Sequence, residues 1–251
     1  MIIKANIEGK LLHPLSPRLP CPVLQYADDT LIIVKATPGA AKHLKSILDS
    51  FAAATGLQIN FDKTTFIPLN VDPTDASLMA AGLATNISSF PQTYLGLPLS
   101  PYKLPPSAFQ PVIDRCDIYL AGWCVLLLSH GGKLVLLSAV LDSLPTYFML
   151  CFALPVQVIE AIDKRRRTFF WSNDDTCSGA KCLVAWDKVC TPREAGGLGV
   201  KNLRAQNFCL LLKFAYKFYT RPTFPGRLDT ASLSPPYWAW CKKLLPSKNH
   251  F

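Results

Sequence analysis

The strongest constraint on the fold is an acidic pair between two short β-favouring runs near the start of the chain. The runs are Val23 to Tyr26 and Thr30 to Val34, and Ala27-Asp28-Asp29 lies between them. Runs of this composition on either side of a short polar turn are typical of a β-hairpin. The sequence therefore predicts a hairpin that carries both carboxylates at its tip.

A helix and a further strand are predicted after this hairpin. Pro38-Gly39 breaks the chain before residues 40–55, which place four large apolar residues on one helical face: Leu44, Ile47, Leu48 and Phe51. Gly56 stands where a helix C-cap is expected, and residues 57–61 alternate as a strand does. Residues 23–67 are thus predicted to form a compact α+β unit, with the helix on one face of the sheet.

Four segments are predicted along the chain, with the main division near residue 105. Residues 1–22 form a lead-in that holds four prolines between residues 11 and 22, and residues 23–105 form the α+β part. Residues 106–171 are a mainly helical region, and residues 172–251 are a basic extension with a Gly-rich segment and a helix. The predicted helices of the later half cover residues 106–121, 133–153, 155–171 and 202–219.

The net charge is concentrated in the second half of the chain. The 251 residues include 26 basic and 17 acidic side chains, a net charge of +9. Residues 1–120 hold 9 of each sign, whereas residues 121–251 hold 17 basic and 8 acidic side chains. This excess suggests an anionic partner such as nucleic acid, and a solvated basic surface is the alternative.

Residues 134–154 have the length of a membrane span but the pattern of a core helix. Asp142 and Pro145 interrupt the apolar run. Ser138 and Asp142 would form a polar edge beside an apolar face made of Leu134, Leu137, Val140, Leu141 and Leu144. We therefore expect a buried amphipathic helix and no membrane partner.

Cysteine usage and the N-terminus predict an intracellular chain, in the nucleus or the cytoplasm, that is not secreted. The nine cysteines are scattered, no CxxC pair occurs, and the first residues lack the apolar core of a signal peptide. Cys177, Cys182 and Cys190 cluster loosely, but their spacing fits no common zinc module. Free thiols in a reducing compartment are the expected state.

Asp28 and Asp29 are the candidate metal ligands. Adjacent carboxylates repel each other unless a cation lies beside them, and Mg²⁺ is usually held by one or two carboxylates together with substrate phosphates. In two-metal phosphoryl transfer, such ions stabilise the attacking and the leaving oxygens. A solvated Asp-Asp turn without a ligand is the alternative that the dipeptide alone leaves open.

Three motifs in this order resemble the palm of reverse transcriptases. Tyr26-Ala-Asp-Asp29 resembles their metal-binding motif, and Gly56-Leu-Gln-Ile-Asn-Phe-Asp-Lys63-Thr64 resembles the next palm motif of the retroelement enzymes. Tyr94-Leu-Gly-Leu-Pro98-Leu resembles the primer-grip hairpin that follows. The later chain is similar to the thumb side of non-LTR (LINE-type) retrotransposon polymerases of plants, so the resemblance covers about residues 2–219. Its short motifs are Gly122-Trp123, 128–133, Leu144-Pro145-Thr-Tyr147, Leu154-Pro155, 167–171, 186–192 and 196–200.

The resemblance implies nucleotidyl transfer with Mg²⁺ or Mn²⁺, on an RNA template and a DNA primer. Asp28 and Asp29 would be the catalytic metal ligands, and Tyr26 and Lys63 would contact the incoming nucleotide. The primer-grip residues would be Tyr94, Leu95, Gly96, Leu97 and Pro98. Nucleic-acid phosphates would be contacted by Lys133, Lys164, Arg165, Arg166 and Arg167. Trp123 and Trp171 are expected to belong to the core rather than to a base-stacking platform.

Parts of the family pattern are missing from this chain. The 25 residues before Tyr26 contain no Asp, Glu8 is their one acidic residue, and no Gln-Gly-Asp-Pro type loop occurs among them. The family places a further metal-binding Asp and the fingers in that region. We therefore expect a truncated palm and thumb portion that is inactive alone, and a non-catalytic basic nucleic-acid-binding module is the alternative.

Overall fold

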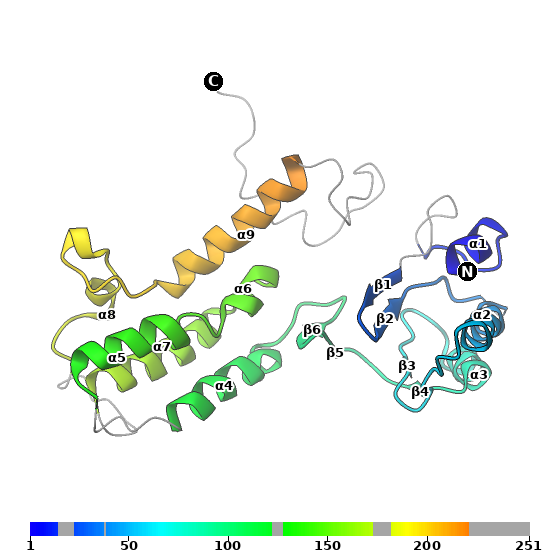
Figure 1. Ribbon diagram of the computed structural model, residues 1–251, viewed down its shortest axis with the longest axis horizontal. Helices are drawn as coiled ribbons and strands as arrows, with labels where there is room; N and C mark the ends of the chain where they lie inside the picture. The colour runs from blue at the N-terminus through cyan, green and yellow to red at the C-terminus, as the bar shows by residue number, and fades with distance from the viewer. Residues whose placement is uncertain (15–22, 38, 122–127, 173–181, 221–251) are drawn as a thin grey trace. The chain divides into compact units, whose positions relative to one another are not determined.

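A computed structural model of the protein describes residues 1–14, 23–37, 39–121, 128–172 and 182–220 (Figure 1). The chain divides into two compact units. The first unit holds residues 1–92 and 99–101, and the second holds residues 93–98 and 102–251. The described residues combine helices with three two-stranded sheets, so the fold is compatible with the predicted α+β class.

The predicted acidic hairpin is present in the first unit. It consists of β1 (Val23–Tyr26) and β2 (Asp29–Ile32), which pair antiparallel from Val23 opposite Ile32 to Tyr26 opposite Asp29 (Figure 1). The turn contains only Ala27 and Asp28, and Ala27 has a φ of 51°. Two-residue hairpin turns require positive φ values, which explains this unusual conformation at a non-glycine residue.

The predicted helix is also confirmed and contributes three buried residues to the core of the first unit. Helix α2 (Ala40–Thr55) ends at Gly56, whose φ of 73° gives the left-handed cap that glycine adopts most easily. Its buried residues pack against helix α3 (Pro73–Leu83) and α1 (Ile2–Ile7) in a small apolar cluster. The buried members of this cluster are Ala5, Leu11, Ala40, Ala41, Leu44, Met79 and Leu83.

The predicted strand at residues 57–61 is wrong. These residues are loop and turn, because the Asn60 side chain accepts a hydrogen bond from the Lys63 backbone N–H at 3.0 Å. Such local bonds compete with strand pairing. The strand that forms is the shorter β3 (Thr65–Phe66), which pairs in parallel with β4 (Asn86–Ile87).

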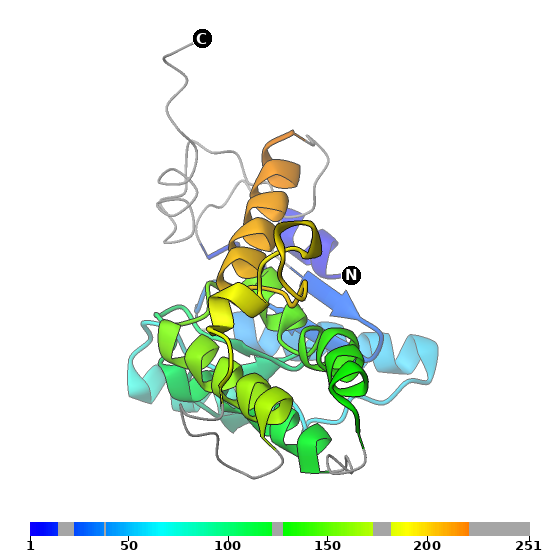
Figure 2. The same cartoon turned by 90° about the vertical axis from the view of Figure 1, so that its left-hand side faces the viewer.

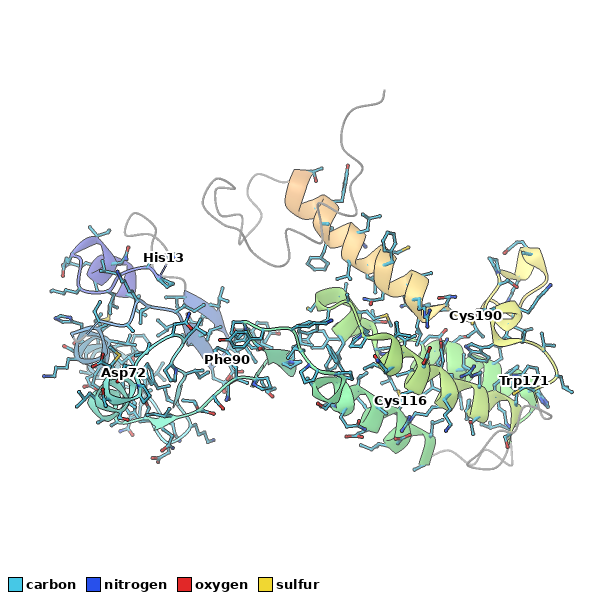
Figure 3. The ribbon with its side chains drawn as sticks, turned by 180° about the vertical axis from the view of Figure 1, so that it is seen from behind. His13, Asp72, Phe90, Cys116, Trp171 and Cys190 are labelled. Atoms are coloured by element: carbon cyan, nitrogen blue, oxygen red, sulfur yellow. The ribbon has the colours of Figure 1, made fainter. Side chains whose placement is uncertain are left out.

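Helix α3 was not predicted, although the sequence carries its start signal. Asp72 is the N-cap and accepts a hydrogen bond from the Thr74 backbone N–H at 2.9 Å, and Pro73 occupies the first helical position (Figure 3). Asp followed by Pro is a common helix start, because proline lacks only an N–H that would have no partner there. The weak apolar periodicity of residues 73–83 hid this helix.

The second unit is mainly helical (Figures 1 and 2). Its residues 93–98 belong to the hairpin of β5 (Gln92–Tyr94) and β6 (Leu97–Leu99), which the sequence predicts at Tyr94 to Leu99. The helical elements, in chain order, are η1 (Pro106–Phe109), α4 (Gln110–Ala121), α5 (His130–Leu136), η3 (Leu137–Leu141), α6 (Thr146–Cys151), α7 (Val156–Trp171), α8 (Trp186–Val189), η5 (Arg193–Ala195) and α9 (Leu203–Thr220). Helix α7 packs against both α4 and α5, and α6 packs against α9.

The single helix predicted over residues 133–153 is broken into three pieces. Helix α5 passes into the π-helical η3, and α6 begins only after Pro145. Proline has no backbone N–H to donate within a helix. Pro145 therefore precedes a new helix, α6, and does not continue η3. No described helix is long and apolar enough to cross a membrane.

Asn207 fastens α9 to the end of α6. Its side chain donates hydrogen bonds to the carbonyls of Met149 and Phe152 at 2.9 and 2.8 Å, and accepts one from the Leu154 backbone N–H at 2.9 Å. Asn207 is only 5% exposed, so water cannot take over its hydrogen bonds to these backbone groups. The side chain therefore satisfies the C-terminal end of α6, where helices leave carbonyls unpaired.

We expect Asn207→Leu to destabilise the second unit by about 3 kcal/mol, because it leaves buried backbone groups without partners at similar side-chain volume. Urea unfolding followed by circular dichroism measures this loss. Cys209→Ala, at an exposed position on the same helix, is the matched control and should change stability by less than about 0.5 kcal/mol. Equal stability of the two variants would contradict the role given to Asn207.

Candidate functional site

The two adjacent carboxylates are displayed on the β1–β2 hairpin. Asp28 lies in the turn, and Asp29 is the first residue of β2, directly opposite Tyr26. Both aspartates are exposed, and the side chain of Tyr26 is 65% exposed. The hairpin therefore offers two carboxylates and one aromatic hydroxyl to a ligand from solvent.

Lys63 belongs to the same unit but lies in a turn outside the β1–β2 hairpin. It follows Asn60 in the turn that replaces the predicted strand, and its side chain is exposed. Among the described residues, Lys63 forms no ion pair with Asp28 or Asp29. The role of Lys63 beside a nucleotide stays a prediction.

The donor set of the hairpin suits one kind of metal ion. In the part of the chain that the structure describes, no three His, Cys, Asp or Glu residues gather as a metal cage. Mg²⁺ commonly keeps several waters and takes one or two carboxylates together with phosphate oxygens. Two adjacent exposed carboxylates fit that partial coordination, and the remaining ligands would come from water and substrate.

The β5–β6 hairpin contains the predicted primer-grip residues. Leu95 and Gly96 form its turn, with φ values of 51° and 76°. Gly96 is exposed, whereas Tyr94, Leu97 and Pro98 are half-buried. Leu97 packs against the apolar core of the second unit, so the hairpin is seated on that core and presents its turn outward.

Sequence reasoning missed the residue that binds this turn. The Tyr147 hydroxyl donates a hydrogen bond of 2.7 Å to the Leu95 carbonyl, across 52 positions of sequence. Tyr147 lies in a motif that carries the family resemblance, Leu144-Pro145-Thr-Tyr147. Nothing in the spacing of that motif indicates a partner in the hairpin, because the contact depends on how α6 packs.

Residues 164–167, the basic run on α7, lie partly at the surface and partly in the core. Lys164 is exposed, and Arg165 and Arg167 are half-buried. Arg165 forms a bidentate pair with Asp117 of α4, at 2.5 and 2.7 Å. Lys164 and Arg167 therefore remain the members of this run best placed to contact phosphates.

Arg166 is not available to nucleic acid, which corrects the prediction made for it. Its side chain is 0% exposed and forms ion pairs at 2.5 Å with Asp142 and with Asp163. It also donates to the Lys201 carbonyl at 2.8 Å, and the Lys201 backbone N–H donates to Asp142 at 3.1 Å. A buried charge needs such partners, since removal from water is costly.

Asp142 is likewise buried, at 0% exposed, so the polar edge predicted for it is wrong. Burial raises the pKa of Asp142, and the nearby Arg166 guanidinium opposes that rise. The residue lies between the helical pieces that the sequence merged into one helix. Its position on a helix face therefore did not reveal its surroundings.

Lys133 is also removed from the predicted set of phosphate contacts. The side chain is 4% exposed, and its ammonium group donates to the Ser172 carbonyl at 3.5 Å. Burial lowers the pKa of Lys133 because it disfavours the charged form. This lysine links α5 to the end of α7 inside the second unit.

The aromatic and cysteine predictions have separate outcomes. Trp171 is half-buried and packs edge-on against Phe170 with ring centroids 4.7 Å apart, as expected of a core residue (Figure 3). Trp123 and Cys177 lie outside the described residues. Burial raises the pKa of the Cys190 thiol to about 11.

A cavity of about 480 Å³ lies between α7, α8 and the start of α9. Its charged lining includes Glu160, Asp163 and Asp187 as well as Arg167 and Arg204. Arg204 pairs with Glu160 at 3.1 Å, and Asp163 pairs with Arg166. The lining therefore carries charges of both signs.

Comparison with known proteins gives two plant relatives, while no family model matches the chain. The chain is 33% identical over 122 residues to "Putative ribonuclease H protein" of Arabidopsis thaliana, a match that covers 48% of this chain and 19% of that protein. It is 32% identical over 83 residues to an uncharacterized mitochondrial protein of the same plant, over 32% of this chain and 52% of that protein.

The chain spans about a fifth of the length of the first relative and about half of the second. The comparisons therefore show that part of this chain is similar to parts of two plant proteins.

We expect Arg166→Met to destabilise the second unit by roughly 3–5 kcal/mol, because Asp142 is left buried without its partner. Arg165→Met, which breaks the more exposed pair with Asp117, is the matched control and should cost about 1 kcal/mol or less. Urea unfolding at pH 7 measures both losses. The difference between wild type and Arg166→Met should shrink at low pH, because the protonated Asp142 is neutral and the folded variant binds that proton more tightly than the unfolded chain. A loss that is independent of pH would contradict this assignment.

Proposed function

We propose that the chain is the palm and thumb portion of a reverse transcriptase from a LINE-type retrotransposon. The reaction is the RNA-templated transfer of nucleotides to a DNA primer. The observation that carries the proposal is the β1–β2 hairpin, which presents Asp28 and Asp29 side by side and exposed, opposite Tyr26. The plant relatives, typical of retrotransposon-derived sequences, support the same origin.

Four residues of the first unit have defined roles in this proposal. Asp28 and Asp29 hold Mg²⁺, which when bound stabilises the charge on the reacting phosphate oxygens. Lys63 offers a compact positive charge to the triphosphate, and Tyr26 contacts the nucleotide from the edge of the hairpin. The β5–β6 turn of the second unit positions the end of the primer.

In this proposal, Asp28 and Asp29 alone do not complete a catalytic centre. A two-metal centre takes its ions with several carboxylates, and the described residues add no third acidic, His or Cys ligand to the hairpin. A metal ion held by Asp28 and Asp29 alone would be bound weakly and would stabilise the transition state poorly. We therefore expect metal and nucleotide binding without efficient synthesis.

We expect Mn²⁺ with a deoxynucleoside triphosphate to broaden the amide NMR signals of residues 26–30 in the 251-residue chain. The double variant Asp28→Asn, Asp29→Asn should lose that broadening, because neutral amides are poor ligands for hard cations. Asp62→Asn, Asp75→Asn removes two exposed carboxylates elsewhere in the first unit and is the matched control. Unchanged broadening in the Asp28, Asp29 variant would refute the metal site.

Primer extension on an RNA template, in Mg²⁺ and in Mn²⁺, tests the second half of the proposal. No incorporation is expected from the folded chain. Incorporation that disappears in the Asp28→Asn, Asp29→Asn variant would show that the centre is complete, and would overturn the expectation of inactivity while supporting the polymerase assignment.

The basic second unit supplies nucleic-acid affinity in this proposal. Residues 121–251 hold more than twice as many basic as acidic side chains, and Lys164 is exposed next to the half-buried Arg167. Binding through phosphates releases counterions and therefore weakens as salt rises. A module that only binds nucleic acid would show the same behaviour without the metal site.

We expect Lys164→Gln, Arg167→Gln to weaken binding of single-stranded RNA, and to reduce the slope of log K against log salt by about 1.4, since each lost phosphate contact contributes about 0.7. Fluorescence anisotropy over a salt series measures the slope. Lys4→Gln, Lys42→Gln removes the same charge from exposed positions of the first unit and should leave the slope within about 0.3 of wild type. Equal slopes in the two variants would contradict a phosphate site on α7.

A further inference from the structure

We propose that Tyr147 is the positioning residue of the β5–β6 turn, and that its hydroxyl holds the turn in the shape that receives the recessed 3′ end of a primer. This inference rests on the proposed function, since the substrate of the turn is taken from it. The contact itself is a feature of the second unit alone: Tyr147 and Leu95 both belong to that unit.

The backbone of the turn needs support from outside the hairpin. Leu95 has a φ of 51°, in the left-handed region that side chains other than glycine disfavour. A hairpin of two three-residue strands has few hydrogen bonds of its own with which to hold that conformation. The 2.7 Å hydrogen bond from Tyr147 to the Leu95 carbonyl supplies a contact that is retained only while the carbonyl keeps its direction.

Tyr147 is itself 47% exposed, and the helix that carries it is anchored in the core of the second unit. Its neighbours on α6, Phe148 and Met149, are buried, at 8% and 0% exposed. The end of α6 is bonded to the Asn207 side chain of α9 through three backbone groups. Tyr147 therefore transfers the rigidity of the helical core to a two-residue turn, as preorganised binding sites require.

The opposite edge of the turn is open. Gly96 is exposed, and a Cβ built on it would meet no atom within 4 Å. Its φ of 76° suits glycine, and the missing side chain lets another backbone approach closely. The turn is thus held at the Leu95 carbonyl and free at Gly96, which is the arrangement expected where a nucleic-acid strand end is to be seated.

We expect Tyr147→Phe, which keeps the ring and removes only the hydroxyl, to raise amide hydrogen exchange in residues 93–97 at least tenfold. We also expect wild type to prefer a primer–template with a recessed 3′ end over a blunt duplex of equal length, and the variant to lose most of that preference. Affinity for the blunt duplex and its salt dependence should stay as in wild type, because the variant removes no charge. Tyr216→Phe, at a tyrosine that is 66% exposed on α9, is the matched control and should change neither measurement.

The two measurements separate failure of this inference from failure of the proposed function. A wild-type chain with no preference for the recessed end contradicts primer positioning, and with it the substrate assigned to the turn. A preference that persists in Tyr147→Phe overturns the role of Tyr147 and leaves the proposed function standing. Unchanged hydrogen exchange in the variant overturns the role of Tyr147 whichever duplex is preferred.

Discussion

The buried ion pair between Arg166 and Asp142 organises the helical unit of this protein. Arg166 comes from the middle of α7, Asp142 follows the π-helical η3, and the backbone of Lys201 joins them just before α9. One charged pair therefore fixes three segments that are separated by 24 to 59 positions of sequence. Neither charge can leave the interior alone without a large cost, so these segments are held in one arrangement.

The rigidity set by this pair extends toward the β5–β6 turn. Helix α9 begins next to Lys201, its Asn207 secures the end of α6, and α6 carries Tyr147 to the Leu95 carbonyl. The Asn207 bonds to Met149 and Leu154 are buried, the Lys201–Asp142 bond is partly buried, and the Tyr147–Leu95 bond is exposed. The geometry of the turn thus depends on core packing some distance away, which is how preorganised sites are usually supported. The acidic hairpin of the first unit is different, because its carboxylates are exposed and their display depends on local pairing.

The predictions from sequence succeeded where the determinant was local and failed where it was not. The β1–β2 and β5–β6 hairpins, helix α2 and its Gly56 cap follow from composition, turn residues and periodicity. The strand predicted at residues 57–61 failed because the Asn60 side chain closes a turn that alternation cannot reveal. Helix α3 does not follow from apolar periodicity, because its apolar pattern is weak and only the Asp72-Pro73 start signal marks it.

The sequence by itself determined that Asp28 and Asp29 stand together at the end of a hairpin, because a two-residue turn between paired strands is specified by its immediate neighbours. It also determined the basic balance of the second half, because charge is additive along a chain. Only the tertiary structure decided which basic side chains of residues 164–167 reach solvent. Arg166 points into the core because its ion-pair partner Asp142 is buried there. Asp142 lies 24 positions earlier in the sequence, so no pattern within α7 indicates where that partner is.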